Sequence, residues 1–189
     1  PSAVALLRQG EREAHDFLDM ARFIRSRLPA HLRTVLAGGV NDEGSKSEME
    51  WPNHSRIVAY PATEHAGRSS NESVVIMDEA DFHEYFEANY SALAPTVSTG
   101  SAQLIVSSTS NYSTMDSGFK RLWRGAPGNG FTPLFWPWKV RPDRDQTWYD
   151  KGLLEALSAA KFQKEHPTSA EEALAAPQTV MAFDNDALE

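Results

Sequence analysis

The sequence of 189 residues contains no cysteine, which excludes disulfides, thiolate zinc sites and cysteine nucleophiles. It has no apolar run approaching the roughly 20 residues of a membrane-spanning helix and no basic-then-apolar signal segment. The six histidines show neither H-x₃-H nor HExxH spacing, which argues against a zinc site. Mean hydropathy is -0.47, typical of one globular domain, or one domain with a small appendage, with the cytosol as the default location.

An excess of basic residues is also lacking. The 26 Asp and Glu residues outnumber the 18 Lys and Arg residues, giving a net charge of -8. This argues against a simple nucleic-acid-binding module, which is normally basic. Residues 120–124 and 139–144 are local basic clusters. Contact with a DNA backbone is one interpretation of each, but most such clusters are solvated faces.

Short apolar runs predict strands, and amphipathic or capped stretches predict helices. The predicted strands are residues 3–7, 48–51, 56–60, 74–77, 103–107 and 131–138. The predicted helices are residues 11–28, 82–93, 115–124, 145–157, 159–165 and 168–175, the last with Thr168 and Glu171 as a capping box. Strands that alternate with helices imply an α/β fold with a mostly parallel sheet.

Two adjacent acids follow the apolar run at residues 74–77, namely Asp78 and Glu79. An unpaired buried charge is costly, so the pair is expected at the carboxyl end of the strand, where open α/β sheets bind ligands. In nucleotide hydrolases of the P-loop type, the first such carboxylate holds Mg²⁺ and the second orients or deprotonates water. The alternative is an ordinary strand followed by an acidic turn.

A phosphate loop, GxxxxGK[ST], is absent from the sequence. The nearest segment, residues 39–47, has one residue too many between glycine and lysine. Its Asp42 and Glu43 would point negative charge at a phosphate, and no long helix follows to present its N-terminus. We therefore reject it as a nucleotide site.

Two further segments carry polar groups suited to phosphate. Ser108, Thr109 and Ser110 follow the predicted strand at 103–107, where hydroxyls can sense a γ-phosphate. The alternative is a Ser/Thr-rich loop that caps the next helix. Arg68 lies in a loop before the acidic strand and is a candidate arginine finger, the alternative being a solvated loop arginine.

Taken in order, these segments resemble the large terminase subunit of tailed bacteriophages, an ATP-driven motor that packages DNA. The resemblance extends from about Ala3 to Phe183, and it lies in the order and spacing of several motifs rather than in any single one. The segments that carry it are residues 2–14, 53–57, 74–82 (VVIMDEADF), 104–110 (LIVSSTS), 131–148 and 162–174 (FQKEHPTSAEEAL).

The resemblance implies a three-layer, RecA-like P-loop ATPase core with ATP and Mg²⁺ as cofactors. By position, Asp78 would coordinate Mg²⁺, and Glu79 would be the catalytic carboxylate that acts on water. Ser108, Thr109 and Ser110 would couple hydrolysis to DNA movement, and Arg68 is a weaker candidate for the arginine finger. Expected partners are double-stranded DNA, the portal, the small terminase subunit and other copies of the chain in a ring, with no membrane, in the cytoplasm of the infected bacterial host.

Two family features are missing, the phosphate loop expected before Pro1 and the nuclease domain expected after Glu189. We therefore expect residues 1–183 to be a partial ATPase domain truncated at its N-terminus, followed by a tail or linker at 184–189, with weak or no hydrolysis by the isolated chain. The alternatives are a helicase-like P-loop ATPase, a catalytically dead structural or interaction domain, and a metal-dependent nuclease, for which further acids cannot be placed. The motor interpretation requires the acid pair and the hydroxyl loop to lie at the tips of adjoining strands.

Overall fold

The computed structural model describes residues 2–33, 45–66, 72–98 and 102–175. The chain divides into two compact units, one ending at Ser108 and the other beginning at Thr109. The predicted end of the ATPase domain at residue 183 lies outside the described residues. Within the described ranges, no helix combines the length and the apolar character needed to cross a membrane.

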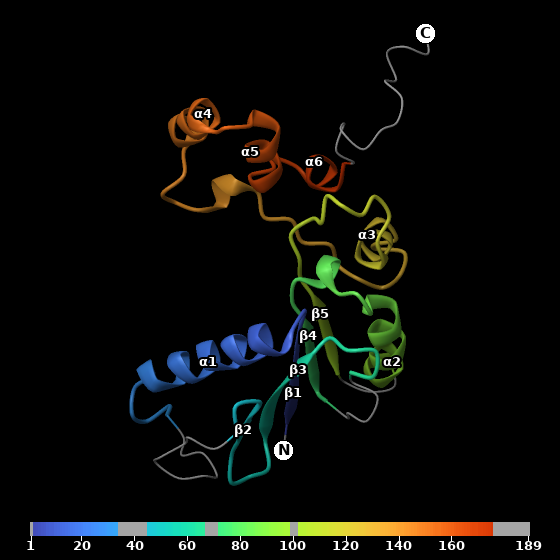
Figure 1. Cartoon of the computed structure of the whole chain (residues 1–189). Helices are drawn as coiled ribbons and strands as arrows, with labels where there is room; N and C mark the ends of the chain where they lie inside the picture. Colours follow the sequence, from blue (N-terminus) through green and yellow to red (C-terminus); the bar gives the residue numbers. More distant parts are fainter. Residues whose placement is uncertain (1, 34–44, 67–71, 99–101, 176–189) are drawn as a thin grey trace. The chain divides into compact units, whose positions relative to one another are not determined.

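The first unit is built on a five-stranded sheet with the order β2-β3-β1-β4-β5 (Figure 1). The strands are β1 (Ala3–Arg8), β2 (Glu48–Glu50), β3 (Arg56–Pro61), β4 (Val74–Met77) and β5 (Gln103–Val106). Strands β3, β1, β4 and β5 are parallel, and only β2 runs antiparallel, against β3. The predicted α/β class with a mostly parallel sheet is confirmed.

The register aligns the carboxyl ends of β1, β4 and β5. Met77 of β4 pairs with Leu7 of β1 on one side and with Val106 of β5 on the other. The ladder continues past the strand ends, because the Asp78 amide donates to the Leu7 carbonyl (3.0 Å) and the Ser107 amide donates to the Met77 carbonyl (2.9 Å). The residues that follow β1, β4 and β5 therefore share one edge of the sheet.

Helices lie on both faces of this sheet. Helix α1 (Glu11–Arg27) has acids in its first turn and arginines in its last, which suits the helix dipole. Its buried Ala14 and Leu18 pack with Leu6, Met49 and Ala59 of the sheet. Helix α2 (Phe86–Ser98) lies on the other face, beside β5 (Figure 1). The first unit thus has the three predicted layers.

Helix α2 begins later than predicted. A 3₁₀ turn, η1 (Ala80–Phe82), follows the acid pair, and the helix starts only at Phe86 and continues through Pro95. The predicted start at residue 82 was wrong because the 3₁₀ turn ends at His83, whose extended backbone (φ -75°, ψ 120°) interrupts the helical conformation before Phe86.

The second unit consists of short helices. These are α3 (Gly118–Arg124), η2 (Trp138–Val140), α4 (Gln146–Glu155), α5 (Ala159–Glu165) and α6 (Ala170–Leu174). The predicted strand at 131–138 was wrong, since these residues make no sheet pairs among the described residues. Pro133 and Pro137 interrupt the run and lack the amide hydrogen that a sheet ladder requires.

The cap of α6 is displaced by one residue from the prediction. The N-cap is Ser169, whose hydroxyl accepts from the Glu172 amide at 3.1 Å. The Glu172 carboxylate accepts in turn from the Thr168 amide at 2.8 Å. The predicted pairing of Thr168 with Glu171 was therefore wrong; the side chain that returns to the start of the helix is Glu172, and it binds the residue before the N-cap.

Candidate functional site

The acid pair and the hydroxyl-bearing segment meet at the carboxyl edge of the sheet. Asp78 and Glu79 follow β4 directly, and Ser107 follows β5. The Ser107 hydroxyl donates a hydrogen bond of 2.9 Å to Asp78 Oδ1. Because β4 and β5 are parallel neighbours in register, this contact places the two strand tips side by side, at the edge where α/β sheets bind ligands.

An arginine from a third strand completes the cluster. Arg8, the last residue of β1, places Nη2 at 2.9 Å from Asp78 Oδ2 and 3.0 Å from Glu79 Oε1. The Arg8 guanidinium also lies over the Phe17 ring of α1, 5.3 Å from its centroid. The side chains remain partly open to solvent, at 19% for Arg8, 26% for Asp78 and 42% for Glu79. The cluster is therefore an ion pair that water and solutes can reach.

Sequence analysis missed Arg8 because it reads as an ordinary turn residue after the first strand. Arg8 ends the strand that becomes the neighbour of β4, so strand order would have placed a cation beside the two acids. The order of strands in a sheet is not visible in hydrophobic periodicity, which reports only that a strand exists.

Glu79 is held in an uncommon backbone conformation. Its φ of 55° and ψ of 37° lie in the left-handed region, which costs a non-glycine residue about 1 kcal/mol or more. The Glu79 carbonyl accepts from the Phe82 amide at 2.9 Å, closing the 3₁₀ turn. Such strain gathers at functional sites, where it fixes the direction of a side chain.

The loop after β5 is bound to the turn that follows the acid pair. The Ser107 carbonyl accepts from the Ala80 amide (3.0 Å), and the Ser108 hydroxyl accepts from the Asp81 amide (3.0 Å). The turn and the loop are therefore mechanically linked. The role of Ser108 in coupling hydrolysis to DNA movement stays a prediction.

The remaining predicted site residues are placed differently. Thr109 and Ser110 begin the second unit, and Ser110 is buried with a hydroxyl that has no hydrogen-bond partner among the described residues. Arg68 lies outside the described residues. The structure thus brings together Asp78, Glu79, Ser107 and Ser108, and it adds Arg8.

A histidine that sequence analysis did not single out supports the acidic turn. His83 is buried, and its Nε2 lies 2.8 Å from the Asp78 carbonyl oxygen. Burial lowers the pKa of His83 from its usual value, against the opposing effects of its hydrogen bond to the Asp78 backbone and the Asp78 charge. A neutral ring whose Nε2 carries the proton donates to that carbonyl and fixes the backbone of Asp78.

The donor set fits a magnesium ion that arrives with phosphate. Among the described residues there is no group of three or more His, Asp or Glu side chains that could hold a metal by itself. Mg²⁺ retains several waters and is usually bound through one or two carboxylates together with substrate phosphates. Asp78 and Glu79 provide such a pair, accessible from solvent.

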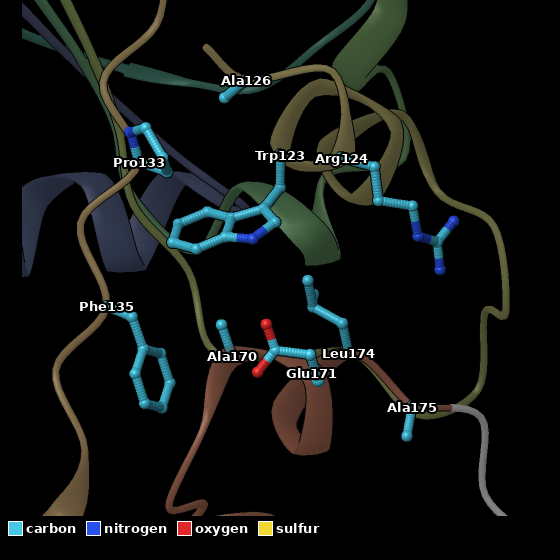
Figure 2. Close-up of a pocket in the computed structure, with 9 residues that line it drawn as sticks. All are labelled: Trp123, Arg124, Ala126, Pro133, Phe135, Ala170, Glu171, Leu174 and Ala175. Atoms are coloured by element: carbon cyan, nitrogen blue, oxygen red, sulfur yellow. The ribbon is translucent and has the colours of Figure 1, made fainter.

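Two surface cavities lie elsewhere in the described parts of the chain. One, of about 550 Å³, lies within the second unit and is lined by Trp123, Phe135 and Leu174 among others, with the Glu171 carboxylate at its side (Figure 2). The other, of about 660 Å³, lies in the first unit around Trp51 and the turn between β2 and β3. Neither includes Asp78 or Glu79.

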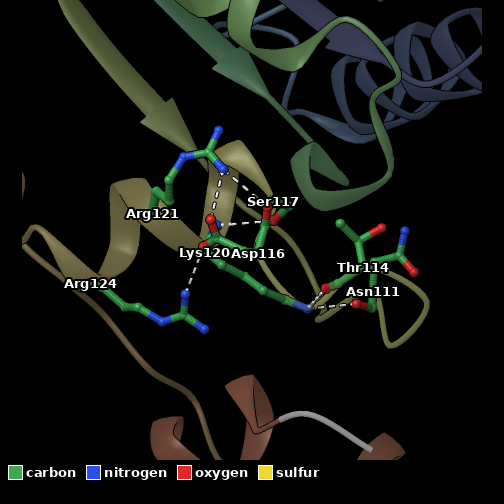
Figure 3. Close-up of polar contacts among 7 residues, drawn as sticks. All are labelled: Asn111, Thr114, Asp116, Ser117, Lys120, Arg121 and Arg124. Carbon is green, nitrogen blue, oxygen red and sulfur yellow. Dashed lines mark hydrogen bonds and ion pairs between the residues drawn. The ribbon is translucent and has the colours of Figure 1, made fainter. Parts of the chain in front are cut away.

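The basic cluster at residues 120–124 is largely engaged within the protein. Lys120 is 2% exposed, and its ammonium donates to the carbonyls of Asn111 (2.6 Å) and Thr114 (2.5 Å) (Figure 3). Arg121 and Arg124 both bind Asp116, at 3.0 and 2.9 Å, and the hydrogen bond from Arg121 is the main cause that lowers the Asp116 pKa. Lys120 therefore fastens the loop of residues 111–114 to α3 rather than facing solvent.

Comparison with known proteins gives similarity to solved structures. No protein family matches the chain, and no curated protein matches it. Among solved structures, the ATPase domain of the large terminase from a Thermus phage is similar, with a TM-score of 0.49 and 18% identity over 87% of this chain and 75% of that chain. An arginine-to-alanine variant of the same domain gives the same values.

Proposed function

We propose that this chain supplies the metal-binding and water-activating half of a nucleotide-hydrolysing site. The observation that carries the proposal is the 2.9 Å hydrogen bond from the Ser107 hydroxyl to Asp78 Oδ1, because it places a carboxylate pair and a hydroxyl-bearing loop at adjoining strand tips. That arrangement suits phosphoryl transfer to water, in which catalysis is mostly positioning and electrostatic stabilisation.

Each residue has a distinct role in this proposal. Asp78, oriented by Ser107, holds Mg²⁺, which when bound neutralises the charge of the transferring phosphate. Glu79 accepts the proton of the attacking water, and its left-handed backbone fixes the direction of its carboxylate. Ser108 links the loop after β5 to the turn after Glu79, so a change at the phosphate can be passed to residues 109–114.

The proposal also requires groups that bind phosphate, and the printed sequence contains no phosphate loop to supply them. The next step in the proposal is that hydrolysis moves double-stranded DNA into a capsid, and it depends on the order of motifs that resembles the large terminases. Under this proposal the chain works in a ring of copies with a portal and a small terminase subunit, with ATP and Mg²⁺ as cofactors. ATP-dependent protection of DNA inside capsids by the full gene product would test that step.

Hydrolysis itself is tested by ATP turnover in the full product of the gene. Glu79→Gln should lower kcat at least about 100-fold while Mg²⁺–nucleotide still binds, and Asp78→Asn should weaken the dependence on Mg²⁺. Glu84→Gln, at an exposed carboxylate shortly after the pair, is the matched control and should leave kcat unchanged. Turnover that survives Glu79→Gln would contradict the proposal. Full turnover by the 189-residue chain alone would contradict the expectation that this chain is weakly active.

A second candidate function is a structural or interaction domain of the same fold that does not hydrolyse nucleotide. The ion pair of Arg8 with both acids favours it, because a cation from the chain itself already offsets part of their charge. In that case Mg²⁺–ATP would leave the melting temperature of the full gene product unchanged. A rise in melting temperature that disappears in Asp78→Asn would favour the hydrolase instead.

A further inference from the structure

Arg8 occupies the place between the two acids where a cation would bind. A single nitrogen, Nη2, lies 2.9 Å from an oxygen of Asp78 and 3.0 Å from an oxygen of Glu79. We infer that Arg8 exchanges partners. In the absence of ligand, Arg8 holds the carboxylate pair together. When a divalent cation arrives with phosphate, Arg8 releases the pair to the cation, and its guanidinium then contacts the phosphate. This inference rests on the proposed function.

The first step follows from charge. Two adjacent carboxylates repel each other, and a cation between them removes that repulsion. Arg8 supplies this cation from within the chain. A divalent cation seeks the same oxygens, and a guanidinium and a metal ion repel each other at such a distance. Cation binding therefore competes with the Arg8 contacts, and Arg8 lowers the affinity of the pair for free metal.

The second step follows from the unused hydrogen-bonding capacity of Arg8. Its Nε is buried and has no hydrogen-bond partner among the described residues. A buried donor without an acceptor is costly, and a guanidinium is well suited to phosphate because it presents several donors in a planar fork. A phosphate oxygen beside the acid pair would provide the acceptor that the present arrangement lacks.

The surroundings of Arg8 allow its side chain to move while its backbone stays in place. The Arg8 carbonyl accepts from the Ala62 amide at 2.7 Å, and Arg8 pairs with Pro61 at the end of β3, so the main chain is fixed. The guanidinium rests on the Phe17 ring, a contact that permits sliding because it has no strict directional requirement. The exchange therefore needs only rotation of one side chain.

Equilibrium dialysis of the 189-residue chain against Mn²⁺, alone and with inorganic pyrophosphate, tests the exchange. With Mn²⁺ alone, Arg8→Met should bind about 3- to 10-fold more tightly than the unchanged chain, corresponding to the loss of one partly exposed competing ion pair. With Mn²⁺ and pyrophosphate together, the same variant should retain pyrophosphate at least about 3-fold more weakly. Opposite effects on the two ligands are the signature of an exchange.

Three variants make the result specific. Arg8→Lys keeps the charge without the fork and should fall between Arg8→Met and the unchanged chain. Arg12→Met, at a residue whose side chain is 90% exposed and whose ion pair is with Asp16, should bind both ligands as the unchanged chain does. Asp78→Asn should abolish Mn²⁺ retention in every background. Circular dichroism and the melting temperature of each variant establish that it is folded.

The possible failures can be told apart. If the unchanged chain retains Mn²⁺ and folded Arg8→Met retains it equally or less, the exchange is wrong while the carboxylate site stands. If Arg8→Met binds Mn²⁺ more tightly but retains pyrophosphate as well as the unchanged chain, the proposed phosphate contact is wrong. If neither folded chain retains Mn²⁺ at millimolar concentration, the metal site of the proposed function is wrong, and the exchange is wrong with it.

Discussion

Ser107 donates its hydroxyl to Asp78 Oδ1 at 2.9 Å, across two parallel strands that are separated by 29 positions in the sequence. This contact leaves Oδ2 of the same carboxylate to Arg8. Asp78 is thereby oriented from both sides, by a neutral donor from β5 and by a cation from β1. A ligand that displaced Arg8 would meet an Asp78 whose direction is already fixed.

Removing the Ser107 hydroxyl should cost measurable stability. Ser107→Ala is expected to lower the free energy of unfolding by about 1 kcal/mol, since a hydrogen bond to a charged acceptor is lost but Asp78 can still be hydrated. Urea unfolding measures this. Ser26→Ala, which removes a hydroxyl bonded within its own helix at an exposed position, should stay within about 0.5 kcal/mol of the unchanged chain. Equal effects of the two substitutions would show that the contact with Asp78 contributes nothing.

The left-handed backbone of Glu79 predicts that glycine is a more stable replacement than alanine at this position, the reverse of the usual order. Glycine normally destabilises relative to alanine, but at a left-handed position it avoids the steric cost of Cβ. With φ at 55°, Glu79→Gly should therefore be more stable than Glu79→Ala by about 1 kcal/mol. Both variants lose the Arg8 contact, so the difference between their free energies of unfolding isolates the backbone. Glu84→Gly and Glu84→Ala provide the reference pair, and a higher stability of Glu79→Ala would contradict the left-handed assignment.

The sequence specified the elements of the first unit well because their signals are local. Apolar runs gave all five strands of the sheet within about two residues, and the acid pair was placed at a strand end because buried charge is costly. What the sequence could not show is long-range. Arg8 lies 70 positions from Asp78 and meets it only because β1 pairs with β4. Strand order and a left-handed glutamate have no periodic signature.

The second unit shows where local patterns mislead. The aromatic residues from Phe131 to Trp138 have high strand propensity, but propensity in strands mostly reflects packing on a sheet. In the part of the chain that the structure describes, no strand lies beside this segment to form a ladder with it. Lys120 carried a similar ambiguity. A basic cluster predicts a solvated face, whereas the carbonyls of Asn111 and Thr114 provide this lysine with a buried site. That site depends on how the backbone of the loop bends, and composition does not show such a bend.

The buried Lys120 predicts a large effect of removing its charge. Lys120→Met keeps the length and the apolar stem but leaves the carbonyls of Asn111 and Thr114 without their donor, which should cost about 2 kcal/mol of unfolding free energy. Urea unfolding followed by tryptophan fluorescence measures this, since Trp123 lies on the same helix. Lys139→Met, at an exposed lysine of the same unit, is the control and should have little effect. If Lys120→Met is as stable as Lys139→Met, the ammonium does not hold the 111–114 loop.

Tyr112 fixes the same loop to α5 and gives a prediction in alkaline solution. Its hydroxyl donates to the Lys164 carbonyl, and the Lys164 ammonium lies 4.6 Å from the centre of its ring. Burial, followed by the charges of Glu165 and Glu172, raises the pKa of Tyr112 to about 12. Spectrophotometric titration near 295 nm should therefore show a late step near pH 12 that is missing in Tyr112→Phe and kept in Tyr85→Phe.

The same shift determines how stability depends on pH. A raised pKa means that the folded state keeps the proton of Tyr112 while an unfolded tyrosine loses it at about pH 10. The contribution of Tyr112 to stability is therefore complete below about pH 10 and is lost as the pH rises from there to about 12. In Tyr112→Phe this pH-dependent loss of stability should be absent. The free energies of unfolding of Tyr112→Phe and of the unchanged chain should therefore converge as the pH rises. A constant difference between them from pH 9 to 12 would show that the Tyr112 hydroxyl titrates alike in both states, and that its bond to Lys164 does not stabilise the loop.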